Sequence, residues 1–321
     1  MLLSFLVLSV GFVALTNGAN ANFKGVASLY GSGTTTLKTA LAWGTLCTFA
    51  GSVGALFLAQ GLLKSFSGRG LVSENLLESP IFTASVALGA ALTSFLANRF
   101  GFPVSTTHAL LGALVGSGLS AQGYDQVQLS ALRKTFLYPL FFSPWIAFVS
   151  GWALYGILGR LDLAPSYRTK NLDRAHFVSS GAASFARGLN DTPKIAALLL
   201  MVPWLDPSAC IMLIGILIAL GAILDAKHVA ETLGKKVTDM NPGQGFAANL
   251  VTSILVATAS LHSLPVSTTH VSVGALLGMG ACTQQAKWSK LLQIVLAWIT
   301  TVPIAAALAA VVYWLMIWVL G

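Results

Sequence analysis

The chain alternates long apolar runs with short breaks rich in glycine, proline, serine or asparagine. The clearest apolar runs cover residues 2–15, 40–63, 81–97, 108–119, 136–158, 209–224, 246–261, 270–281 and 291–320. Several approach the roughly 20 residues that a helix needs to cross a bilayer, and the last exceeds this length. The others are short and resemble the half-helices found inside membrane proteins. The pattern predicts an all-α integral membrane protein with about ten to twelve membrane segments, half-helices included.

The hexapeptide PVSTTH occurs twice, at residues 103–108 and again, 162 residues later (265 minus 103), at 265–270. Each copy follows a break and precedes an apolar run, so the chain consists of two related halves. Broken helices at matching places in two halves are typical of inverted-topology repeats. We therefore predict a first repeat over residues 1–160, a central polar loop over 161–175 and a second repeat over 176–321.

Composition supports the membrane prediction. Hydrophobic residues make up 55% of the chain and charged residues 9%, against about 25% charged in a typical soluble domain. The net charge of +8 comes without a basic run, so we expect a lipid bilayer and not a nucleic acid as partner. Arg160, Arg168, Lys170 and Arg174 crowd the central loop, and cytoplasmic loops carry an excess of such residues. These features predict a multi-pass protein of the cell (inner) membrane with its central loop in the cytoplasm.

A weaker repeat precedes each hexapeptide. GANANFK at residues 18–24 aligns without gaps with GLNDTPK at 188–194, which pairs Asn20 with Asn190 and places Ala21 opposite Asp191. The same alignment pairs the lysines that end the two segments, Lys24 and Lys194. Both segments interrupt apolar stretches, as expected where a membrane helix unwinds around a ligand or an ion.

Each PVSTTH copy has the residues of a helix start. Proline favours a non-helical approach, and serine and threonine are natural N-cap residues. Helix N-termini carry partial positive charge and bind anions. Two such termini meeting near the membrane centre would surround a small oxyanion with donors from both halves. The donors are Ser105, Thr106, Thr107, Ser267, Thr268 and Thr269.

Plainer interpretations of these residues stay open. The hydroxyls can cap helices without a ligand, and His108 and His270 can serve in packing as well as in ligand contact. A membrane hydrolase is not expected, because Ser105 and His108 lie three residues apart in one helix with no acidic third member nearby. We therefore predict that the protein is not an enzyme.

The asparagine breaks supply the candidate cation site. Asn20 and Asn190 can offer amide donors to an anion or carbonyl oxygens to a cation, and Asp191 is a carboxylate in a membrane break, where charge is costly and usually functional. Asp191 could ligate Na+, carry a proton, accept a hydrogen bond from a protonated ligand, or form an ion pair with Arg187 or Lys194. Lys24 and Lys194 either neutralise an anion or snorkel to the membrane edge.

These doubled motifs, together with LGKKVTDMNPGQGFAANL at 233–250, resemble the PiT-type inorganic phosphate transporter family from residue 17 to about 280. The resemblance implies an inverted-repeat secondary transporter, commonly a homodimer, that moves phosphate inward with Na+ or H+ and needs no other cofactor. It also implies that the anion and cation sites consist of Asn20, Asn190, Asp191 and the two Ser-Thr-Thr triplets.

Ala21 departs from the family pattern, which has aspartate there. The absence of that aspartate implies that fewer Na+ ions are coupled to transport, or that protons are coupled through Asp191. It also bears on the substrate, because a carboxylate accepts the P–OH donor of phosphate and repels sulfate, which has no such donor. With Asp191 retained, phosphate is the predicted substrate. Sulfate remains the alternative substrate, and a passive anion channel the alternative mechanism.

Overall fold

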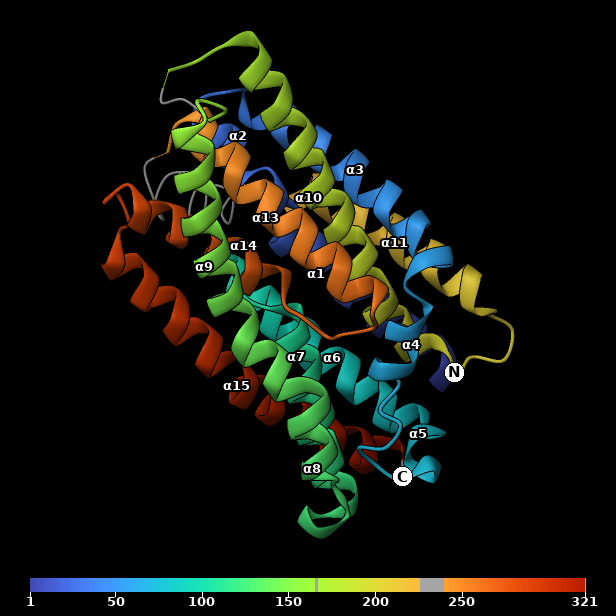
Figure 1. The fold of residues 1–321 in the computed structure, drawn as a ribbon. Coiled ribbons are helices and arrows are strands. Elements are labelled where there is room, and N and C mark those ends of the chain that lie inside the picture. The colour runs from blue at the N-terminus through green and yellow to red at the C-terminus, as the bar shows by residue number, and fades with distance from the viewer. Residues whose placement is uncertain (165–166, 226–239, 321) are drawn as a thin grey trace.

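The structure is a computed structural model that describes residues 1–164, 167–225 and 240–320. Over these ranges it is a bundle of long helices packed side by side, without a β-strand (Figure 1). Seven of the helical segments are long and apolar enough to cross a membrane: Leu2–Gly25, Leu37–Leu58, Pro80–Arg99, Ser130–Arg160, Pro207–Leu224, Pro242–Leu261 and Leu292–Leu320. The prediction of an all-α membrane protein is confirmed.

The long helices follow the same order in both halves of the chain. They are α1 (Leu2–Ala21), α3 (Leu37–Leu58), α6 (Pro80–Arg99), α7 (Thr106–Gln122) and α9 (Tyr138–Arg160), then α10 (Lys170–Ala196), α11 (Pro207–Asp225), α13 (Pro242–Leu261), α14 (Thr268–Cys282) and α15 (Trp288–Leu320). Counting the polar α10 and the shorter α7 and α14 with the seven apolar spans gives ten segments in the described ranges, within the number predicted.

Short helical elements connect the long ones. They are η1 (Asn22–Gly25), α2 (Ala27–Gly31), α4 (Gln60–Phe66), α5 (Glu74–Leu77), η2 (Tyr124–Gln126), α8 (Leu129–Leu132), η3 (Arg133–Leu137) and η4 (Ala197–Leu199). Residues 165–166 of the predicted central loop, and residues 233–239 of the family-like stretch, lie outside the described ranges.

Helices of the two halves exchange neighbours. Helix α3 packs against α10 and α11 against α1, while α9 packs against α14 and α15 against α7. Glycines at matching positions permit these crossings, because a Cβ on Gly18 or Gly221 would collide with the backbone across the α1–α11 contact, and one on Gly188 or Gly51 would do so across the α3–α10 contact. Small residues allow membrane helices to approach this closely. The two halves therefore form one interlocked bundle.

The outer surface suits lipid. Large apolar side chains are exposed along the long helices, among them Phe57 on α3, Trp152 on α9 and Trp318 on α15. The interior instead holds many polar and several charged side chains, including Lys24, Arg187 and Lys194. Charged groups in a membrane protein are expected to face the interior of the bundle, where they can find partners.

Both PVSTTH copies start helices as predicted. Ser105 and Ser267 are the N-caps of α7 and α14, with nearly equal backbone angles, and their hydroxyls accept from the backbone N–H groups of His108 and His270. The two serines are buried, so each helix begins inside the protein and not at its surface. This is the half-helix arrangement that the short apolar runs indicated.

The predicted unwinding at 188–194 is wrong in its position. Helix α10 continues through the whole segment to Ala196, and only then does the backbone tighten into η4. In the first half α1 likewise continues to Ala21 before η1 begins. The helix persists because the polar side chains of these segments find partners on neighbouring helices, so that the backbone keeps its own hydrogen bonds.

Candidate functional site

The starts of α7 and α14 bind each other inside the bundle. The hydroxyl of Thr107 donates to the carbonyl oxygen of Val266 at 3.2 Å, and the hydroxyl of Thr269 donates to the carbonyl oxygen of Val104 at 3.0 Å. Each threonine thus bonds to the residue before the N-cap in the other half. The two hexapeptides, far apart in sequence, form one structure with approximate two-fold symmetry.

Two buried lysines complete this pair of helix starts. The Nζ of Lys24 donates to the carbonyl oxygen of Val104 at 2.8 Å and to Oγ1 of Thr269 at 2.5 Å. The Nζ of Lys194 donates to the carbonyl oxygen of Val266 at 2.6 Å and to Oγ1 of Thr107 at 2.9 Å. The contacts of Lys24 in the first half are therefore matched one for one by the contacts of Lys194 in the second half.

Burial decides between the two roles considered for these lysines. Lys24 is 4% exposed and Lys194 is fully buried, so neither side chain reaches the membrane edge. Snorkelling is therefore wrong for both. Each lysine contacts the carbonyl of its own half and the hydroxyl of the other half, which places both ammonium groups where the halves meet.

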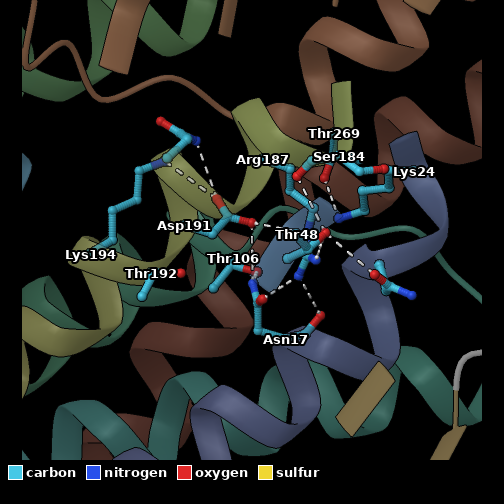
Figure 2. Close-up of polar contacts among 12 residues, drawn as sticks. Asn17, Lys24, Thr48, Thr106, Ser184, Arg187, Asp191, Thr192, Lys194 and Thr269 are labelled. Atoms are coloured by element: carbon cyan, nitrogen blue, oxygen red, sulfur yellow. Dashed lines mark hydrogen bonds and ion pairs between the residues drawn. The ribbon is translucent and has the colours of Figure 1, made fainter. Parts of the chain in front are cut away.

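Asp191 lies among cations and amides, as Figure 2 shows. Its carboxylate is 3.7 Å from Nε of Arg187 and 3.7 Å from Nζ of Lys194, and it accepts hydrogen bonds from the side-chain amides of Asn17 at 3.3 Å and Asn190 at 3.2 Å. The ion pairs that were one of the alternatives for Asp191 are thus present.

Asn17 belongs to the site although the sequence argument did not select it, and so does Arg187, which the sequence argument named only as a possible ion-pair partner of Asp191. Arg187 donates to Oδ1 of Asn17 at 2.6 Å and to the hydroxyl of Thr48 at 3.1 Å, and Asn17 donates to the hydroxyl of Thr106 at 2.7 Å (Figure 2). The signal that could have found them is the gapless repeat, in which Asn17 and Arg187 are also paired, one position before the glycines.

Asn20 and Asn190 occupy equivalent places with different partners. Asn190 donates to the carbonyl oxygen of Val266 at 3.3 Å, and its own Oδ1 accepts from Ser260 at 3.2 Å. Asn20 donates to Oδ1 of Asn98 at 2.7 Å and to the carbonyl oxygen of Phe102 at 2.9 Å, while its Oδ1 is buried without a hydrogen bond. Asn190 therefore joins the cluster around Asp191, whereas Asn20 bonds to the end of α6 and the segment after it.

The remaining predicted residues line the same region. Ser105 and Ser267 cap their helices, and Ser105 also bonds to Nδ1 of His108 at 2.8 Å. Thr268 is buried at the position of α14 that corresponds to Thr106. The rings of His108 and His270 face each other with centroids 4.5 Å apart, and His270 also contacts the ring of Trp298. These contacts give the histidines a packing role at the junction of the halves.

The charges of this cluster do not cancel. Counted formally, the three cations Lys24, Arg187 and Lys194 face the one carboxylate of Asp191, which leaves a surplus of two positive charges among these four side chains. Burial strengthens the electrostatic interactions of these charges, because little water screens them. The arrangement is suited to a small anion that carries two negative charges.

A cavity of about 780 Å³ opens near one end of the bundle, between α4, α6 and the start of α11. It shares Val86, Leu114 and Leu198 with a much smaller space that contains Lys194 and is bounded by the rings of Phe66 and Phe136. The two rings are in edge contact, with centroids 5.2 Å apart. Lys194 thus lines a small space with otherwise apolar walls, three residues of which also line the cavity.

Comparison with known proteins agrees with this geometry. The model of the phosphate transporter family matches residues 17–174 and again 164–309, once for each half. The chain belongs to the phosphate transporter family. Its members are membrane transport proteins, so this chain is a multi-pass membrane transporter and not an enzyme.

Individual relatives cover nearly the whole chain. A probable low-affinity inorganic phosphate transporter of Rhizobium meliloti is 29% identical over 95% of this chain and 96% of its own length. A sulfate permease of Bacillus subtilis is 28% identical over 84% of this chain and 74% of its own length. Among solved structures, a sodium-dependent phosphate transporter superposes with a TM-score of 0.88 over 99% of this chain and 100% of that one at 23% identity, which shows a shared fold.

Proposed function

We propose that the protein is a secondary transporter that imports inorganic phosphate across the cell membrane, coupled to Na+ or H+. The observation that carries the proposal is the junction of the two PVSTTH helix starts, where two lysines contact threonine hydroxyls from both halves and Arg187 is linked to Thr106 through Asn17. Phosphate is a tetrahedral oxyanion, and helix N-termini and cationic side chains are the groups that bind it in proteins. The relatives named as phosphate transporters support the same substrate.

The proposed site joins residues from both repeats, taken as residues 1–160 and 176–321 around a central loop at 161–175. The substrate ligands are Asn20, Ser105, Thr106, Thr107, Asn190, Asp191, Ser267, Thr268 and Thr269, of which Asn20, Asn190 and Asp191 also serve the coupling cation. The unpartnered Oδ1 of Asn20 supports a cation role, because a buried amide oxygen without a donor is an open ligand position. We further propose a homodimer in the membrane.

Sulfate is the second candidate substrate, because a relative is named as a sulfate permease and because Ala21 stands in the first half at the position where the second half has the carboxylate of Asp191. Phosphate is favoured by Asp191. At neutral pH phosphate keeps a P–OH donor that this carboxylate can accept, whereas sulfate offers only acceptors and would be repelled.

The test is uptake of labelled phosphate and labelled sulfate into proteoliposomes that contain the full chain, with an imposed Na+ or pH gradient. Accumulation of phosphate against its own gradient, with competition by phosphate stronger than by sulfate, is expected. Sulfate uptake that phosphate does not reduce would reverse the choice of substrate. Movement of anion only down its gradient would indicate the passive channel instead.

A further inference from the structure

We propose that the ammonium groups of Lys24 and Lys194 take the places of sodium ions in the substrate site, so that phosphate binds without Na+. The inference rests on the proposed function and adds to it the source of the positive charge. It starts from the atoms around each Nζ, which are oxygens: a backbone carbonyl and a threonine hydroxyl in both cases, and for Lys194 also the carboxylate of Asp191.

These oxygens are of the kind that binds sodium in transporters. Val104 and Val266 lie in the non-helical segments directly before α7 and α14. Unwound backbone carbonyls beside half-helices are the typical ligands of coupling cations at such sites. Here each carbonyl already accepts from an ammonium group. A covalently attached cation therefore fills each place.

The symmetry of the contacts argues against accidental packing. Each lysine is the last residue of one asparagine segment and extends to the carbonyl of its own half and to the hydroxyl of the other half. Two independent packing lysines would not be expected to repeat this crossed pattern. The two positive charges are delivered to the junction where both sets of helix-start donors lie.

The charge balance leads to the same conclusion. Lys24, Lys194 and Arg187 against Asp191 give a formal surplus of two, which a phosphate dianion would neutralise without any free cation. A sodium ion entering the same cluster would raise the surplus to three and would meet repulsion from charges that burial leaves poorly screened. The fixed ammonium groups thus make sodium unnecessary for substrate binding.

The two lysines are not equal. Asp191 is 3.7 Å from Nζ of Lys194 and neutralises part of its charge, whereas the matching position in the first half is Ala21. Among the contacts of the cluster, Lys24 has only neutral partners, a carbonyl and a hydroxyl. Lys24 is therefore the charge most available to the anion, and its removal should weaken phosphate binding more directly.

The first experiment needs no variant. Stabilisation of the purified full chain by inorganic phosphate is measured as a shift of the unfolding temperature in choline buffer and in the same buffer with Na+. The phosphate concentration for half the shift should be the same in both, and uptake driven by a pH gradient should proceed in Na+-free vesicles. Phosphate binding that strictly requires Na+ would overturn the inference and leave phosphate transport standing.

The second experiment opens one cation place. Lys24→Ala should raise the half-saturating phosphate concentration by about tenfold or more in choline buffer, equivalent to about 1.4 kcal/mol or more. Added Na+ should restore part of the loss, because the oxygens of Val104 and Thr269 lose their ammonium donor and can coordinate the ion. Lys38→Ala removes an exposed lysine as the control and should change neither value.

The outcomes separate the two proposals. Unchanged Na+-free affinity in Lys24→Ala, with wild-type stability, would show that Lys24 only joins the two halves and would overturn the inference. A loss that Na+ does not restore would likewise contradict exchange between ammonium and sodium. If the wild type binds no phosphate in any buffer, the proposed function itself fails and the inference falls with it.

Discussion

The two halves of the site share a scaffold and differ in charge. Thr107 and Thr269 make matching bonds, and so do Lys24 and Lys194. The carboxylate breaks the match, because Asp191 has only Ala21 as its counterpart. The asparagines break it too, since the Oδ1 of Asn190 is satisfied and that of Asn20 is not. The symmetric contacts hold the helix starts together, and we propose that the asymmetric ones decide which ions bind there.

The largest effect is expected from removing the negative charge of Asp191 in the second half. Asp191→Asn keeps the shape of the side chain but leaves Arg187 and Lys194 without their shared counter-charge, and breaking a buried ion pair from one side costs about 3–5 kcal/mol. Accumulation of labelled phosphate should fall to background in proteoliposomes. Asp162→Asn, at an exposed position, is the control. Near-normal accumulation would remove Asp191 from the mechanism.

The next effect comes from making the halves alike. Ala21→Asp adds a carboxylate at the position that matches Asp191, beside Lys24, and lowers the positive surplus by one. Preference for phosphate over sulfate should rise, by about fivefold or more for a gain of at least 1 kcal/mol, and transport should become more dependent on Na+. Competition uptake with both labelled anions measures the change. Ala21→Asn controls for size, because Ala21 is fully buried; equal behaviour of the two variants would refute the charge argument.

A smaller effect tests the symmetry of the scaffold itself. Thr107→Val and Thr269→Val each remove a hydroxyl that accepts from a lysine and donates to the opposite valine carbonyl. Losing such bonds costs about 1 kcal/mol or somewhat more, so the apparent affinity for phosphate should fall about fivefold in each variant. Concentration dependence of uptake gives both values. A large difference between them would show that the scaffold is functionally unequal as well.

The smallest effect concerns the helix caps. Ser105→Ala and Ser267→Ala remove N-cap acceptors, which stabilise proteins by about 1 kcal/mol each. The unfolding temperature should drop by similar amounts in the two variants, with less loss of phosphate affinity than in the threonine variants. A greater loss of affinity than of stability would instead give these serines direct contact with the anion.

The sequence was sufficient to predict the helical membrane fold and the two helix starts. The helix starts were predictable because an N-cap of serine or threonine after proline depends only on residues that are neighbours in the sequence. It also placed Asn190, Asp191 and the threonines in one region through the repeat. It left Lys24 and Lys194 undecided, gave Arg187 no role beyond an ion pair with Asp191, and missed Asn17, because the partners of these residues lie across the halves. It also misplaced the unwinding at 188–194, since that depends on whether polar side chains find partners on other helices.

The crossings at matched glycines also set the order in which the protein can be built. Helix α1 is made before α11, its partner at Gly18, which comes from the second half of the chain. The contact between α3 and α10 likewise joins a helix of the first half to one of the second half, so it cannot form until α10 has been made. These two glycine-lined faces of the first half can therefore be covered only after the second half has been synthesised.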